Sequence, residues 1–92
     1  MLKRSNQYAI LRAAWESGSL ETMRDIQQIV PITVLTEDMK LNYNTLSKRL
    51  LDPARFTVRD VYRLSALIGL EPSVIFNRIL QEVQLQTVQN KN

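Results

Sequence analysis

Side chains suited to contacting nucleic acid are concentrated between Asn42 and Leu50. Asn44 and Thr45 can donate and accept hydrogen bonds at the edges of bases, and an asparagine can pair bidentately with adenine. Lys48 and Arg49 can read guanine or neutralise phosphates. An element that buries one face and offers these groups on another would suit a groove of duplex DNA. This stretch is therefore the first candidate for function.

A short helix is predicted to carry these groups. Asn42 is a favourable N-cap residue, and Leu46 and Leu50 lie four residues apart on one face. The polar and basic side chains fall on the other side of the same helix. The pair Asp52-Pro53 then ends it. The N-cap residue, the leucine face and the Asp52-Pro53 end together predict a helix over about residues 42–51.

The preceding segment, residues 32–39, is locally ambiguous. Several of its residues are β-branched, which on its own would favour a strand. We predict a helix, because no second strand is evident nearby and Leu35 and Met39 lie one helical turn apart. Residues 40–42 would form a polar turn. The stretch 31–51 is therefore predicted to be helix, turn and helix.

The helix after the motif has the clearest start signal in the chain. Thr57 and Asp60 are spaced as a capping box, with Asp in place of the usual Glu. Phe56 and Val61 are placed as a hydrophobic staple around the same cap. Gly69 provides a stop. A helix is therefore predicted between Thr57 and Gly69.

Two more helices are predicted before the motif. Residues 5–16 place apolar residues four apart, and Gly18 suits a left-handed stop. Ser19 is predicted to cap the next helix. Its apolar residues recur every three or four positions until Pro31 ends the run. The first helix is expected to act mainly as a packing strut.

The last helix begins at Pro72, since proline is tolerated in a first turn. Beyond Gln81 the pattern blurs and would also suit an extended segment, and residues 89–92 are predicted to be a flexible tail. The expected fold class is therefore all-α. We expect a compact bundle of five to six short helices in a single domain, residues 1–88.

Composition argues against several function classes. The 92 residues include no cysteine and no histidine, which excludes disulfides, thiolate nucleophiles, cysteine–histidine zinc sites and histidine general bases. Two glycines do not make a phosphate-binding loop. Glu37 and Asp38 are adjacent and would face different sides of a helix, so we do not expect them to act as a pair. We expect no enzyme activity, metal, cofactor or small-molecule ligand.

Positive charge is concentrated in the middle of the chain. The net charge is +3, and residues 40–63 contain six cations and two anions, a local net charge of +4. The remainder is therefore close to neutral, and the basic block coincides with the predicted motif. No apolar run approaches the ~18 residues of a membrane span. We expect a cytoplasmic protein without a membrane partner.

The order of features from Pro31 to Phe76 resembles the lambda-repressor-like helix-turn-helix family, also called Cro-type or XRE-type. Leu35 and Thr36 fill the family's apolar and small positions in the first helix. Leu41 follows the turn, and Leu46 is the inward aliphatic residue of the recognition helix. FTVRDVYRLSALIGL and PSVIF match the capped helix and the start of the closing helix. The resemblance implies a lambda-repressor-like domain with an extra N-terminal helix.

The resemblance also implies a function. We expect sequence-specific binding of double-stranded DNA by a prokaryotic or phage transcriptional regulator, nucleoid-associated, with residues 42–51 in the major groove. Family members commonly dimerise, so we expect a homodimer through residues 72–83. Tyr43 and Arg55 are candidates for backbone contacts, and Thr33 lies at the start of the first motif helix. The candidate DNA-binding residues are Thr33, Asn42, Tyr43, Asn44, Thr45, Lys48, Arg49 and Arg55.

Two positions depart from the family. Lys40 stands where a glycine is usual in the turn, and at a positive φ a lysine would cost about 1 kcal/mol. Ile32 replaces a glutamine that often contacts phosphate, which leaves that role to Thr33. The alternative function is a helical protein-interaction module, antitoxin-like or an adaptor, with little DNA affinity. The N-terminal helices and the glutamine-rich C-terminal segment would supply its interface.

Overall fold

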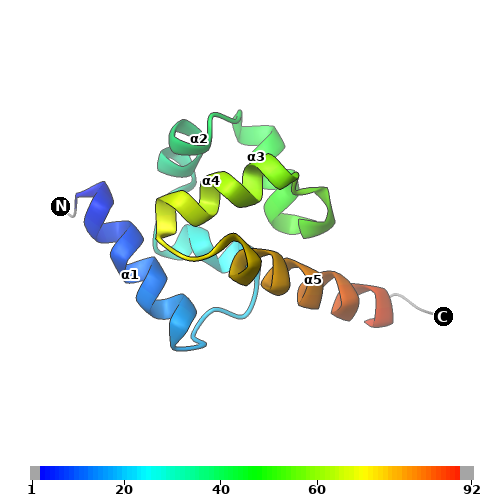
Figure 1. The fold of residues 1–92 in the computed structure, drawn as a ribbon. Helices are drawn as coiled ribbons and strands as arrows, with labels where there is room; N and C mark the ends of the chain where they lie inside the picture. The colour runs from blue at the N-terminus through cyan, green and yellow to red at the C-terminus, as the bar shows by residue number, and fades with distance from the viewer. Residues whose placement is uncertain (1–2, 90–92) are drawn as a thin grey trace.

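The computed structural model describes residues 3–89, and in that part of the chain every regular element is helical. Five α-helices and two short 3₁₀ helices follow one another with short connections (Figure 1). The all-α class is confirmed. In chain order the elements are α1 (Arg4–Glu16), η1 (Met23–Gln28), α2 (Ile32–Met39), α3 (Tyr43–Leu51), η2 (Pro53–Arg55), α4 (Val58–Ile68) and α5 (Pro72–Gln89).

Helix α4 lies at the centre of the bundle and contacts α1, α2 and α5 (Figure 1). Its Val61, Leu64 and Ile68 are buried at the spacing of one helix face. Leu35 of α2 and Leu46 of α3 join the same core from the two helices of the motif. The helix-turn-helix segment and α4 therefore share one hydrophobic core.

Helix α1 belongs to the core. Tyr8, Leu11 and Trp15 are buried, and the guanidinium of Arg78 lies 5.3 Å from the centre of the Trp15 ring. Gly18 has φ 79° just after the helix, which confirms the predicted left-handed stop. The expected packing strut is thus an integral part of the bundle.

The predicted start of the second helix is wrong. Ser19 is not its N-cap, because its backbone N–H donates to Ala14 and its hydroxyl bonds to Ser17, both at the end of α1. The element is a 3₁₀ helix that starts after Thr22, where the carboxylate of Asp25 accepts 3.0 Å hydrogen bonds from the N–H of Thr22 and of Glu21. Those bonds hold the pKa of Asp25 below its usual range.

Helix α5 continues to Gln89, past the position where the pattern blurs. The carboxylate of Glu82 accepts a 2.9 Å hydrogen bond from the N–H of Met23, so the second half of α5 is tied to η1. An extended segment beyond Gln81 was therefore the wrong alternative. The predicted flexible tail falls on Gln89, which is helical, and on residues 90–92, which lie outside the described part.

Candidate nucleic-acid interface

The turn between α2 and α3 is a left-handed helix stop. Lys40 has φ 58°, the only positive φ at a non-glycine position among residues 3–89. The N–H of Leu41 donates to the carbonyl of Thr36 at 3.0 Å, and the N–H of Lys40 to that of Glu37 at 3.3 Å. These two bonds make a Schellman motif. The positive φ considered for Lys40 is therefore present, and it bears the strain that a glycine would avoid.

Helix α3 has the predicted cap. The side-chain oxygen of Asn42 accepts a 2.8 Å hydrogen bond from the N–H of Thr45. Leu46 and Leu50 are buried, which confirms the leucine face. Asn44 and Lys48 are exposed along the opposite side, and Thr45 is half-buried. The fold thus presents a short polar and basic surface on a well-anchored helix.

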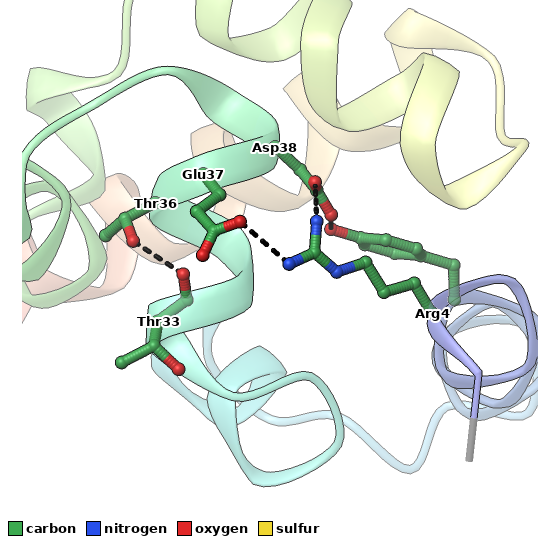
Figure 2. A network of polar contacts seen from close by, with 6 residues as sticks. Arg4, Thr33, Thr36, Glu37 and Asp38 are labelled. Carbon is green, nitrogen blue, oxygen red and sulfur yellow. Dashed lines mark hydrogen bonds and ion pairs between the residues drawn. The ribbon is translucent and has the colours of Figure 1, made fainter.

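Tyr43 opens α3 and leaves more than half of its surface exposed. Arg55, in η2, is exposed and forms a 3.2 Å ion pair with Asp52. Thr33 is exposed in the first turn of α2, and its carbonyl accepts a 2.7 Å hydrogen bond from the Thr36 hydroxyl (Figure 2). These three candidates are accessible, but they come from three different elements.

Arg49 is placed differently from the other candidates. Its Nη1 lies 2.6 Å from Oδ2 of Asp60 in α4, and its side chain is only 22% exposed. The side chain of Asp60 is 3% exposed. The guanidinium of Arg49 is thus directed at a buried carboxylate in the first turn of α4. A sequence signal existed, because Arg49 is three residues from the buried Leu46 and therefore lies beside the leucine face.

Arg63 of α4 contacts the end of α2. Its Nη1 donates a 2.8 Å hydrogen bond to the carbonyl of Met39, the last residue of α2. Carbonyls in the last turn of a helix lack helical partners, and cations there also interact favourably with the helix dipole. The two residues are 24 positions apart, so no local pattern could have paired them.

The adjacent acidic pair of α2, Glu37 and Asp38, binds side chains of α1. Arg4 donates to Glu37 and to Asp38, each at 2.8 Å (Figure 2). The Tyr8 hydroxyl donates to the other oxygen of Asp38 at 2.7 Å. Burial raises the pKa of Tyr8 well above its usual value, and the bond to Asp38 adds to this effect. The pair therefore anchors α1 to the motif.

No known protein family, curated protein or solved structure matches the chain. Within the described residues, no group of three or more histidine, cysteine, aspartate or glutamate side chains could hold a metal ion. No helix of residues 3–89 is both long and apolar enough to cross a membrane. The geometry of the helices and their side chains must therefore support any functional proposal.

Proposed function

We propose that the protein binds double-stranded DNA in a sequence-specific manner, as a prokaryotic or phage transcriptional regulator that is nucleoid-associated in the cytoplasm. The observation that carries this proposal is the division of α3 into a buried apolar face and an exposed polar face. Buried Leu46 and Leu50 hold the helix, and exposed Asn44 and Lys48 line its outer side. A helix with one anchored face and one hydrogen-bonding face suits the major groove. The likeness to lambda-repressor-like domains supports the same function.

The charge around α3 also favours DNA. Two acidic residues lie in the basic block 40–63, and one of them, Asp60, is buried against Arg49. The other, Asp52, is half-exposed and is paired with Arg55. The exposed surface therefore keeps an excess of cations, which supplies the non-specific part of DNA affinity. Arg59, exposed at the start of α4, adds to this surface.

The proposal assigns different roles to the contacting residues. Asn44 reads a base edge, and Lys48 binds a phosphate. Tyr43 and Arg55 bind the backbone, and Thr33 brings the first turn of α2 to a phosphate. The residues proposed to contact DNA are Thr33, Asn42, Tyr43, Asn44, Thr45, Lys48 and Arg55.

Selection from random duplexes tests the proposal, because it measures binding and reads the site together. We expect an enriched sequence whose affinity falls steeply as salt rises from 50 to about 200 mM. Replacing Lys48 by alanine should lower affinity for all sequences, whereas Asn44→Ala should relax the preference at one base pair. Glu71→Ala, in the connection before α5, is the matched surface control. Absence of any duplex binding at low salt would refute the proposal.

A homodimer is part of the proposal, since two copies can place two recognition helices about one DNA turn apart. The second copy would cover an apolar face between α4 and α5. Val58, Tyr62 and Phe76 are 77, 65 and 54% exposed there. Two hollows of about 200 and 250 Å³ adjoin on this face and share Val58, Val61 and Phe76 as lining residues. Light scattering tests the dimer, and Phe76→Glu should dissociate it.

The same apolar face favours a second candidate, the helical interaction module with little DNA affinity. Exposed apolar surface of this kind commonly marks a protein-binding site. The two functions differ in one measurement. The interaction module shows no salt-dependent affinity for any duplex, whereas the DNA-binding domain does.

A further inference from the structure

We infer that Arg49, Asp60 and Arg63 are positioning residues, which fix the recognition helix on α4 without touching DNA themselves. This inference rests on the proposed function, because α3 is a recognition helix only if the protein binds DNA. The contacts that carry it are the Arg49–Asp60 ion pair and the hydrogen bond from Arg63 to Met39.

Asp60 is a fixed anchor for Arg49. Its Oδ2 accepts a 2.9 Å hydrogen bond from the N–H of Thr57, and its own N–H donates to the Thr57 hydroxyl at 3.1 Å. The carboxylate therefore cannot follow Arg49 without opening the cap of α4. The same oxygen accepts from Arg49 at 2.6 Å, which ties α3 directly to that cap. A buried carboxylate requires such partners, because leaving it unpaired is strongly unfavourable.

Arg63 holds the other helix of the motif. It leaves α4 one turn after Asp60 and reaches the carbonyl of Met39, at the point where the chain turns through Lys40. Helix α4 thus fastens the end of α2 through its own Arg63, and the second half of α3 through Asp60, which binds Arg49. The angle between α2 and α3 is therefore set by α4 as well as by the turn. This matters because base contacts require α3 to be held at a defined angle in the groove.

A positioning residue and a phosphate contact differ in the effect of salt. Each phosphate contact adds about 0.9 to the slope of log affinity against log salt concentration. Loss of Lys48 should therefore reduce the slope by about one. Loss of a residue that only orients α3 should lower affinity and leave the slope unchanged. The two roles of an arginine are therefore separable by one titration series.

The first experiment measures affinity for the selected duplex at several salt concentrations. It compares the parent protein with Arg49→Met, Asp60→Asn and the matched exposed change Lys48→Met. We expect Arg49→Met and Asp60→Asn each to lose about tenfold in affinity at an unchanged slope, and the double variant to lose no more than the worse single one. Arg49→Lys, which keeps a cation, should recover part of the loss. A slope reduced by about one in Arg49→Met, with Asp60→Asn at parental affinity, would show direct DNA contact and overturn the inference.

The second experiment needs no DNA, so it separates this inference from the proposed function. The chain has no cysteine, so spin labels can be attached at Asn44→Cys and Asn77→Cys, both exposed. Asp60→Asn keeps an oxygen for the Thr57 N–H and should still fold. We expect the distance distribution between the labels to broaden or shift in Asp60→Asn and in Arg63→Met. Distributions identical to the parent would overturn the positioning role, and absence of duplex binding by the parent would refute the DNA proposal alone.

Discussion

The hydroxyl of Tyr8 donates a 2.7 Å hydrogen bond to Asp38 and thereby joins α1 to α2. Arg4 reinforces the junction by binding Asp38 and the adjacent Glu37. Figure 2 shows Arg4 reaching the two carboxylates from the side of α1. The ring of Tyr8 is also part of the core, so one residue contributes both apolar burial and a charged hydrogen bond. The N-terminal helix is thus fixed to the first helix of the motif.

We predict that Tyr8→Phe lowers the free energy of unfolding by about 1 kcal/mol. The ring stays buried, and only the part-buried hydrogen bond to a carboxylate is lost. Arg4 still partners Asp38, which limits the loss. Urea denaturation followed by circular dichroism measures the change. Arg4→Ala is the comparison, and its effect should be smaller because the Arg4 side chain is half-exposed. Equal stability of Tyr8→Phe and parent would contradict the prediction.

The same residue should make stability depend on alkaline pH. The pKa of Tyr8 is raised in the folded protein, mainly by burial and then by the bond to Asp38. The neutral phenol is therefore favoured by folding, and its contribution is complete below the unfolded pKa of about 10. Above that pH the unfolded chain loses a proton that the folded protein keeps, so the free energy of unfolding falls as pH rises.

This pH effect is measured as a difference between parent and Tyr8→Phe. The free energy of unfolding is measured for both proteins at pH 8, 10 and 11. The parent should exceed Tyr8→Phe by an amount that is constant up to about pH 10 and shrinks above it. Other groups that titrate at high pH are common to both proteins and cancel in the difference. A difference in free energy of unfolding that stays constant up to pH 11 would mean that Tyr8 has the same pKa in the folded and unfolded states.

In the turn between α2 and α3, a substitution should increase stability. Lys40 has φ 58°, a region that glycine adopts without the clash of a Cβ. Lys40→Gly should therefore raise the free energy of unfolding by about 0.5–1 kcal/mol. Lys40→Ala removes the same charge but keeps the Cβ, so it should give no such gain. If both variants gained equally, removal of charge rather than backbone strain would be the cause.

Local signals predicted the elements whose determinants lie close in sequence. The cap of α4 was predictable because Thr57 and Asp60 are three residues apart, and the cap of α3 because Asn42 bonds within its own first turn. The stop at Gly18 has the same local character. Helix α2 was harder, because its β-branched residues favour a strand and its helical state depends on burying Leu35 and Met39.

Contacts between distant residues were not predictable in the same way. Arg49 carries a group suited to DNA, and only packing shows that it is directed at Asp60. Arg63 binds a backbone carbonyl of another helix, 24 positions away, and no local pattern marks such a partner. Glu37 and Asp38 are adjacent in α2, and the single side chain of Arg4 in α1 binds both. In each case the partner of a long, flexible charged side chain depends on how the helices pack, which sequence spacing does not specify.

Asn42 has two possible roles, and one pair of substitutions separates them. Its side-chain oxygen caps α3 through the N–H of Thr45, while its side-chain nitrogen stays available on an exposed residue. Asn42→Ala removes both groups and should lower the free energy of unfolding by about 1 kcal/mol. Asn42→Ser keeps a cap of similar strength but removes the amide. Its stability should therefore stay close to that of the parent.

Affinity for the selected duplex then assigns the second role. If the amide of Asn42 contacts DNA, Asn42→Ser should bind about tenfold more weakly while it unfolds at the parental urea concentration. If Asn42 only caps the helix, the serine variant should match the parent in both measurements, and the alanine variant alone should lose stability. Binding is compared at one fixed salt concentration, because affinity for DNA has no meaning without it. Parental affinity of Asn42→Ser would remove Asn42 from the proposed DNA contacts and leave it as the residue that holds Asn44 and Thr45 in the first turn of α3.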